Sequence, residues 1–316
     1  MKVLVTGASG FIGGHLCAHL VSRDHQVTAV VRREGSAPPD TTEVVVGDVG
    51  PATVWDGVLA GHDAVIHLAA RVHVMRETSG DPLQEFRTVN VEGTRRLAQS
   101  ASKQQVRRFV YLSSIKVNGE ATHGTPFSAR DAPAPVDAYG ISKYEAEVAI
   151  ANEVRNGNMG AVIVRTPLVY GPGVGGNFVR MMKLAASGLP LPLGSVRNRR
   201  SLASVWNLAD LLERAGTDDK ATGAVVLAAD PSSPSTPELL RAMRRAMGKP
   251  ARLVSFPVGL LEVLGKFSGQ KPAIDRLVHS LEVQFGSDSN EWQWEPQISF
   301  EESIERTATW FLSQER

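Results

Sequence analysis

The glycine-rich segment at residues 7–13 constrains this chain more than any other feature. A short β-branched run ends in Gly7, and Gly10 and Gly13 follow at steps of three residues. From Phe11 onward the apolar residues recur with helical spacing. A turn closed by glycines lets backbone N–H groups approach a pyrophosphate, which the positive end of the following helix also attracts. The segment therefore predicts a strand, a turn and a helix that together hold a dinucleotide.

Short apolar runs alternate with helical stretches through the first half of the chain. We expect strands at residues 3–6, 26–31, 43–46, 64–67, 108–112 and 161–165, and helices at 11–22, roughly 53–59, 82–102 and 138–155. Strands that are apolar throughout are typical of a sheet covered on both faces. The alternation predicts an α/β fold with a doubly wound, Rossmann-like parallel sheet.

The pattern loosens after residue 170, where glycine and proline clusters interrupt the chain. We expect residues 1–170 to form a dinucleotide-binding domain. Residues 171–316 would form a smaller, mixed but mainly helical substrate domain over the carboxyl edge of the sheet. The chain is expected to return to the first domain near residues 200–230, with one strand at 224–228. Helices are expected at 177–187, 207–215, 236–247, 257–268 and 299–313.

Composition limits the partners and the compartment. The 34 basic and 33 acidic residues give a net charge of +1, so no excess of charge indicates nucleic acid or an anionic membrane as partner. The only cysteine, Cys17, excludes an intrachain disulfide and is consistent with the cytoplasm. No apolar run approaches the ~20 residues of a spanning helix, so no stable membrane insertion is expected. The longest such run, residues 256–264, predicts a partly buried helix, with contact to a membrane surface as the alternative.

Tyr139 and Lys143 stand four residues apart, so they share one face of the expected helix. A nearby ammonium favours phenolate, so we expect Lys143 to lower the pKa of Tyr139. Such a tyrosine can donate or accept a proton near neutral pH. Ser113 and Ser114 end the preceding apolar strand, and a serine hydroxyl there can hold the same substrate oxygen. These residues predict acid–base chemistry beside the dinucleotide, and no metal site is predicted.

The motifs together resemble the extended short-chain dehydrogenases/reductases, in the group of nucleotide-sugar epimerases, dehydratases and reductases. The stretches that carry this resemblance are Thr6–Gly13, Gly47–Asp48, His67–Ala70, Asn90–Gly93, Leu112–Ser114, Tyr139–Lys143, Arg165–Pro167 and Val169–Pro172. The resemblance implies a nucleotide-sugar substrate, here UDP-linked. By analogy with the family it also implies a homodimer formed through residues 82–102 and 138–155.

The resemblance assigns a role to individual residues. Tyr139 would be the acid–base, Lys143 would bind the nicotinamide ribose, and Ser114 would polarise the reacting sugar oxygen. Asn90 would brace the strand that carries this serine. The cofactor would be held by Gly7, Gly10, Phe11, Ile12, Gly13, Asp48, Val49, Leu68, Ala69, Ala70, Pro167 and Leu168. The substrate would also be held by Ser113, by Asn177 and by Arg200, which matches the arginine that grips the diphosphate.

The end of the second strand bears on the cofactor. Folds that prefer NAD place an acidic residue there to accept a hydrogen bond from the ribose 2′-hydroxyl, but this chain has Arg32 and Arg33. A basic pair suits a 2′-phosphate, so we favour NADP(H), with NAD as the alternative. Because NADPH is the usual reductant in cells, this choice favours a reductase over an epimerase.

Further residues narrow the predicted reaction. The chain resembles a bacterial subgroup of enzymes at Lys116, Asn118 and residues 67–75. The enzymes of this subgroup reduce the 4-keto group of UDP-4-keto-6-deoxy-N-acetylhexosamines. The products, UDP-N-acetyl-quinovosamine or -fucosamine, serve surface polysaccharide. Arg71, His73 and Lys116 are candidate sugar contacts. The alternatives are an NAD-dependent UDP-hexose or UDP-N-acetylhexosamine 4-epimerase and a non-catalytic NAD(P)-sensing protein.

Overall fold

The computed structural model describes residues 1–72, 80–155, 157–288 and 292–315. An eight-stranded sheet with the order β10-β9-β6-β5-β4-β1-β2-β3 forms its centre. Its strands are β1 (Lys2–Thr6), β2 (Gln26–Val31), β3 (Thr42–Val45), β4 (Ala64–His67), β5 (Arg108–Ser114), β6 (Gly160–Thr166), β9 (Val225–Leu227) and β10 (Gly286–Ser287). All neighbours pair in parallel except β10 with β9. The doubly wound α/β fold is confirmed, and each predicted strand lies within two residues of an observed one.

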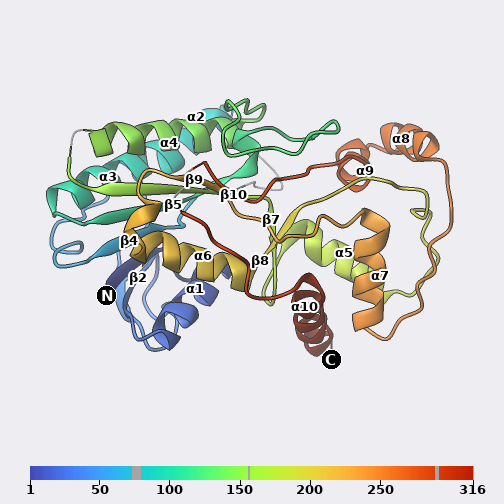
Figure 1. Ribbon diagram of the computed structural model, residues 1–316, viewed down its shortest axis with the longest axis horizontal. Coiled ribbons are helices and arrows are strands. Elements are labelled where there is room, and N and C mark those ends of the chain that lie inside the picture. The colour runs from blue at the N-terminus through green and yellow to red at the C-terminus, as the bar shows by residue number, and fades with distance from the viewer. Residues whose placement is uncertain (73–79, 156, 289–291, 316) are drawn as a thin grey trace.

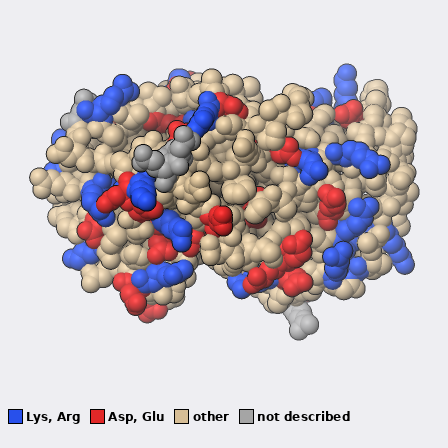
Figure 2. Space-filling model, viewed as in Figure 1, with Lys and Arg blue, Asp and Glu red and all other residues tan. Residues whose placement is uncertain are grey.

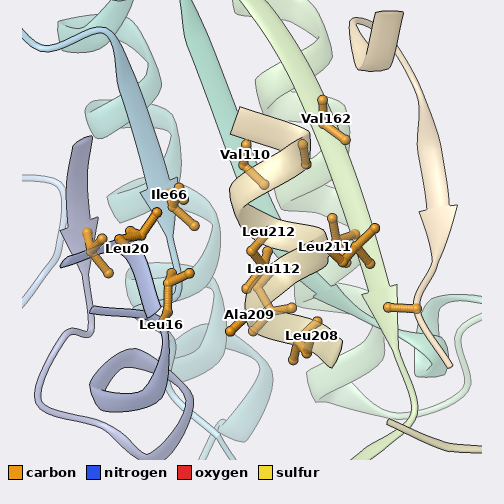
Figure 3. Packing of buried hydrophobic residues seen from close by; sticks show 14 of the residues in the cluster. Leu16, Leu20, Ile66, Val110, Leu112, Val162, Leu208, Ala209, Leu211 and Leu212 are labelled. Atoms are coloured by element: carbon orange, nitrogen blue, oxygen red, sulfur yellow. The ribbon is translucent and has the colours of Figure 1, made fainter. Parts of the chain in front are cut away.

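Helices cover both faces of the sheet (Figure 1). α1 (Phe11–Ser22) and α6 (Val205–Thr217) lie side by side on one face, and α3 (Thr94–Lys103) and α4 (Ala138–Arg155) on the other. Figure 3 shows the first layer, in which leucines of α1 and α6 meet Ile66, Val110 and Val162 of the sheet. These side chains are buried, so the sheet forms a rigid platform for whatever its carboxyl edge carries.

Two helix predictions needed correction. The expected helix at 82–102 consists of three consecutive segments, α2 (Pro82–Phe86), the π-helix η1 (Arg87–Gly93) and α3. The expected helix at 53–59 is absent, because this part of the described chain forms turns in which Gly57 has a φ of +79°. The chain also contains two 3₁₀ turns, η2 (Ile115–Val117) and η3 (Asp219–Ala221).

A second group of elements, the C-terminal lobe, lies beside the sheet (Figure 1). It contains α5 (Gly176–Ala186), α7 (Thr236–Ala246), α8 (Val258–Phe267), α9 (Lys271–Val278), α10 (Phe300–Gln314) and a small sheet of β7 (Leu168–Tyr170) and β8 (Leu202–Ser204). Tyr170, Phe178 and Met243 lie in its separate apolar core. The five helices expected after residue 170 are present, whereas α9, β7 and β8 were not predicted.

The chain crosses between the two parts several times. Strand β9 pairs with β6, which confirms the expected return at residues 224–228, and α6 covers the sheet. Farther along, the indole N–H groups of Trp292 and Trp294 donate to Asp218 at 3.0 Å and Asp210 at 2.6 Å. These bonds fasten the segment before α10 onto α6. The domain boundary at residue 170 stays a prediction.

Candidate active site

The β1–α1 turn has the tight geometry that the glycines predict. Gly7 has a φ of +69°, and a Cβ on it would lie 2.9 Å from the Ala69 backbone nitrogen. A Cβ on Gly13 would lie 2.1 Å from the Gly7 carbonyl oxygen. Side chains at either position would fill the turn, so glycine is required where the backbone must come close to a ligand.

The start of α1 also fits a dinucleotide. Gly10 occupies the N-cap position, and no side chain of the described residues caps the helix there. The first turn has no acidic residue, so its N–H groups and the positive end of the helix dipole can receive an anion. The residues present therefore fit the pyrophosphate of NAD or NADP.

Replacing Gly13 tests this fit. We expect Gly13→Ala to lower the free energy of unfolding by about 1–3 kcal/mol, because its methyl group overpacks against the turn. We also expect it to weaken NAD binding about tenfold or more, measured by calorimetric titration. Gly14→Ala is the matched control, since a Cβ on Gly14 has no neighbour within 4 Å. That variant should raise stability by about 0.5–1 kcal/mol, and equal behaviour of the two would contradict the steric argument.

The predicted cofactor residues of β3 and β4 lie along the same sheet edge. Leu68, Ala69 and Ala70 follow β4, the neighbour of β1, and Asp48 and Val49 follow β3. In parallel strands this carboxyl edge is where ligands bind, at the point where the strand order reverses. The topology therefore places the predicted dinucleotide residues after β3 and β4 at the same sheet edge as the glycine turn.

A buried chain of hydrogen bonds, which the sequence analysis did not include, ties β1 to β4. The Thr6 hydroxyl lies 2.6 Å from His67 Nδ1, and His67 Nε2 lies 2.9 Å from the Thr94 hydroxyl. The Ala69 backbone N–H also donates to the Thr6 hydroxyl, at 3.2 Å. Burial lowers the pKa of His67 to about 3, with a smaller effect of Lys143, so the imidazole is neutral. This chain fixes the loop that faces Gly7.

Ser114, Tyr139 and Lys143 come together at the carboxyl end of β5. Ser114 ends the strand, and Tyr139 and Lys143 project from α4, which packs against β5. A hydrogen bond joins Ser114 to Tyr139. The Lys143 ammonium donates to the Leu112 carbonyl at 2.7 Å. In the strand order β5 lies two positions from β1, so the strand that ends in Ser114 runs about 10 Å from the strand that ends at the glycine turn.

The pKa values of this group differ from the expectation. Burial raises the pKa of Tyr139 to about 12, Asp137 acts in the same direction, and the hydrogen bond from Ser114 only partly offsets both. The prediction that Lys143 lowers this pKa was wrong for the structure. Lys143 turns instead toward Leu112 and lies 4.1 Å from the centre of the Tyr111 ring. Burial lowers the pKa of Lys143 itself to about 7, so its charge depends on pH near neutrality.

Lys116 and Asp137 position the start of α4. Asp137 accepts from the Gly140 backbone N–H at 2.7 Å, as a helix cap does. The Lys116 ammonium donates to Asp137 and, at 2.8 Å, to Glu120. Its charge is thus bound to two carboxylates two residues after Ser114, whereas the contact of Lys116 with the sugar stays a prediction.

Ser113 does not belong to the candidate site. Its hydroxyl is buried and donates to Glu147 at 2.5 Å. Glu147 also receives two N–H groups of Arg165, at 2.7 and 3.0 Å, and Arg165 donates to Asn118. The prediction that Ser113 contacts substrate was wrong, because alternate residues of a strand face opposite sides of the sheet. Ser113 and Asn118 instead complete a buried ion pair beneath α4.

Asn90 has a structural role, as predicted, but it bonds to Arg71 and Ser142 and not to the strand that carries Ser114. Its amide donates to the Arg71 carbonyl at 3.1 Å and to the Ser142 hydroxyl at 3.0 Å, and its oxygen accepts from the Arg71 N–H at 2.8 Å. It therefore joins the loop after β4 to α4, next to Lys143. The Arg71 guanidinium lies 5.8 Å from the Phe86 ring centre, and Phe86 packs edge-on against Tyr139. His73 lies outside the described residues.

The remaining predicted residues lie at the junction with the C-terminal lobe. Pro167 and Leu168 join β6 to β7, and Leu168 is partly exposed. Phe11 approaches Gly171 and Gly173, so the glycine loop after β7 packs on the start of α1. Asn177 is exposed in the first turn of α5, whose N-cap is Gly175.

Arg200 lies in the C-terminal lobe together with a second arginine that the sequence analysis did not assign. Its guanidinium donates to the His279 carbonyl at 3.3 Å. Burial lowers the pKa of Arg200, and the nearby charge of Arg276 on α9 lowers it further. Two neighbouring guanidinium groups favour a dianionic group between them. His279, whose carbonyl accepts from Arg200, also lines a cavity of about 370 Å³, together with Thr122, His123, Ser195, Arg197, Asn198, Val258, Val278 and Ser280.

Contacts join this region to the serine-bearing strand. The loop that follows β5 and η2 donates from the Thr122 N–H to the Ser280 carbonyl at 2.9 Å and from the Phe127 N–H to the Glu282 carbonyl at 2.8 Å. The same 279–284 segment bonds to Arg199 and Ser201. A ligand held by Arg200 would therefore lie on the same side of the protein as the loop that follows Ser114.

Comparison with known proteins gives consistent matches. A model of the family described as NAD dependent epimerase/dehydratase family matches residues 3–228. The chain is 37% identical over 313 residues to a UDP-glucose 4-epimerase of Vibrio cholerae, covering 98% of this chain and 95% of that protein. It is 26% identical over 282 residues to N-acetyl-alpha-D-glucosaminyl-diphospho-ditrans,octacis-undecaprenol 4-epimerase of Escherichia coli O157:H7, covering 86% and 82%. A UDP-glucuronic acid 4-epimerase from Bacillus cereus, solved in complex with NAD, has a TM-score of 0.78 at 20% identity over 100% of both chains, which supports the fold alone.

Proposed function

The chain belongs to the NAD dependent epimerase/dehydratase family, and from that premise we propose that it is a 4-epimerase of a UDP-hexose or UDP-N-acetylhexosamine. It is an enzyme of the extended short-chain dehydrogenase/reductase type. The proposal rests on one observation, that Ser114, Tyr139 and Lys143 are held together at the sheet edge that carries the glycine turn. The 37% identity with an epimerase over nearly the whole chain favours epimerisation over the predicted 4-keto reduction.

The cofactor would be held by the glycine turn, the loops after β3 and β4, and Lys143. When bound, its nicotinamide ring supplies a hydride acceptor and, once reduced, a hydride donor. The residues that would grip the pyrophosphate are Gly7, Gly10 and Gly13, where an added Cβ would lie 2.9, 3.2 and 2.1 Å from the nearest backbone atom.

Tyr139 moves the proton at the sugar O4. Loss of the C4 hydrogen leaves a 4-keto sugar only if O4 also loses its proton, and the Tyr139 oxygen is the acceptor. Ser114, which is bonded to Tyr139, holds O4 in line. With its pKa raised to about 12, Tyr139 is normally protonated, which is the form that returns the proton to O4. The hydrogen bond from Ser114, which acts to lower the pKa of Tyr139, favours the phenolate that begins the cycle.

Arg200 and Arg276 would bind the diphosphate of the nucleotide sugar. A diphosphate fixed at one end leaves the sugar attached through single bonds, which permits the ring to turn over between the two halves of an epimerisation. Fixing the diphosphate also keeps the 4-keto sugar from leaving, so each of the two hydride steps occurs within one binding event.

Conversion of UDP-sugars tests the proposal. The purified chain should interconvert UDP-glucose with UDP-galactose, or UDP-GlcNAc with UDP-GalNAc, followed by proton NMR of the anomeric signals. Conversion should occur with no net change in nicotinamide absorbance, because the hydride returns to the same sugar. A failure with all four sugars, while NAD binds normally, would contradict the epimerase and favour the non-catalytic alternative.

The 4-ketoreductase is the second candidate, because Arg32 and Arg33 follow β2 where an NAD-preferring fold places an acidic residue. Its distinguishing result is oxidation of NADPH by a UDP-4-keto-6-deoxy-N-acetylhexosamine, in equal amount to the sugar that is reduced. That result without any epimerisation would replace the main proposal.

The cofactor preference follows from the same residues. The Arg32 guanidinium lies 3.4 Å from the Asp48 carboxylate, which partly neutralises the charge that would attract a 2′-phosphate. We therefore expect the wild type to bind NAD more tightly than NADP, in titrations of intrinsic fluorescence. Asp48→Asn releases Arg32 and should shift the ratio of the two dissociation constants several-fold toward NADP, whereas Arg32→Ala should shift it toward NAD. A wild type that prefers NADP would support the preference expected from the sequence.

A further inference from the structure

Helix α8 presents an apolar stripe to solvent at the end of the C-terminal lobe (Figure 1). Leu261 and Gly265 face inward, and a Cβ on Gly265 would lie 2.8 Å from Ile274 of α9. Four other apolar side chains of the helix are exposed by about half or more, namely Leu260 (51%), Val263 (49%), Leu264 (56%) and Phe267 (86%). Their spacing of three and four residues puts them on one face. Single exposed apolar residues are ordinary, but four on one helical face mark a contact surface.

The same lobe segregates the charge of the chain. Residues 236–278, from α7 to α9, contain eight basic and three acidic residues and so carry +5, while the rest of the chain carries −4. Only Arg244 of these basic residues is buried. Figure 2 shows lysine and arginine side chains gathered over this end of the molecule. The near-neutral net charge of the chain therefore conceals a basic end that also carries the apolar stripe.

The shape and charge of this end favour one occupant. The stripe lies on a helix at the outer end of the lobe and not in a groove, so it suits a deformable surface better than a rigid partner. A second copy of the chain would bring two segments of charge +5 together, which is unfavourable. Helices with an apolar face and basic residues nearby lie in the interface of anionic bilayers. In the part of the chain that the structure describes, no helix is both long and apolar enough to cross a bilayer.

We propose that α8 docks this protein on an anionic lipid surface, with Leu260, Val263, Leu264 and Phe267 entering the headgroup layer and the basic residues of α7–α9 around it. Val258 at the start of α8 and Val278 at the end of α9 line the same cavity as His279, whose carbonyl accepts from Arg200. Docking would therefore place that cavity next to the membrane. The proposal does not depend on the reaction that the site performs.

Sedimentation with vesicles tests the docking. The full chain should sediment with vesicles of equal parts phosphatidylcholine and phosphatidylglycerol but not with phosphatidylcholine alone, and added salt should weaken the binding. The double variant Leu264→Gln/Phe267→Gln should bind at least about tenfold more weakly, because it removes most of the stripe. Val54→Gln is the matched control, since Val54 is 64% exposed on the sheet half. Its binding should equal that of the wild type.

Charge variants separate the electrostatic part. Lys266→Gln/Lys271→Gln should reduce binding to the anionic vesicles about tenfold or more, and Lys103→Gln/Lys220→Gln, remote from α8, should not. Circular dichroism and epimerisation of a UDP-sugar should be unchanged in all these variants. The proposal is overturned if the wild type ignores anionic vesicles or if the α8 variants bind as well as the wild type. If the α8 variants bind the vesicles as well as the wild type and also have a lower particle mass in light scattering, the proposal is overturned and the stripe is a self-association surface.

Discussion

Turnover of the UDP-sugar is expected to fall by about 10²–10⁴-fold in Tyr139→Phe, the range for loss of a positioned acid–base group. In the proposed mechanism the phenol of Tyr139 is the group that takes the proton from O4 and returns it. Removing its oxygen also removes the hydrogen bond to Ser114. The ring that packs against Phe86 is retained, so the fold should be unaffected. Steady-state kinetics with NAD titrations measure both effects.

The control for this variant is Tyr144→Phe on the same helix. Tyr144 follows Lys143 directly, so the two side chains leave α4 in different directions. Its loss should change turnover by less than about threefold. NAD affinity should stay close to that of the wild type in both variants. If Tyr139→Phe kept more than a tenth of the activity, the proton would have to move through another group.

The second large effect is on stability. We expect Arg165→Leu to lower the free energy of unfolding by about 3–5 kcal/mol, because it leaves the buried Glu147 carboxylate without its counter-charge. Both side chains are less than a tenth exposed, and the two hydrogen bonds between them lie within 3.0 Å. Urea denaturation followed by fluorescence gives the change.

Two further variants locate the cause. Arg107→Leu removes a guanidinium whose ion pair with Asp219 lies at the surface, so its effect should be below about 1 kcal/mol. The double variant Glu147→Leu/Arg165→Leu removes both charges and should recover part of the loss. A change below about 1 kcal/mol in Arg165→Leu would mean that water or Asn118 compensates the carboxylate.

The sequence predicted the sheet well because its strands are short apolar runs between breakers. Thr42–Val45 and Gly160–Thr166, for example, lie within one residue of the predicted limits. The three-residue strands β7 and β8 are too short for a periodic pattern, and α9 is a short helix that begins next to Pro272, two residues after Gly269. Around residue 57, a glycine with positive φ ends what the apolar spacing indicated as a helix.

Local motifs predict the part of the candidate site that single segments carry, but they do not predict contacts between distant segments. Tyr139 and Lys143 share a helix face, and Ser114 ends a recognisable strand. The alternation of the same strand turns Ser113 toward Glu147, which a motif does not reveal. Arg276 reaches Arg200 from a helix 76 residues later in the chain, so only the folded structure brings the two charges together.

The repeated crossing of the chain between its two parts determines when this protein can fold during synthesis. Once residues 1–170 have left the ribosome, β6 is still an open edge, and the sheet face that α6 will cover is bare. The segments that complete this half are synthesised late. Strand β9 comes first, then β10, and last Trp292 and Trp294, whose indoles bond to Asp218 and Asp210. The sheet half of the nascent chain therefore stays incompletely packed, and prone to aggregate, until residue 294 has been made. A fragment ending near residue 170 should accordingly need the remainder of the polypeptide, or a chaperone, to stay dispersed.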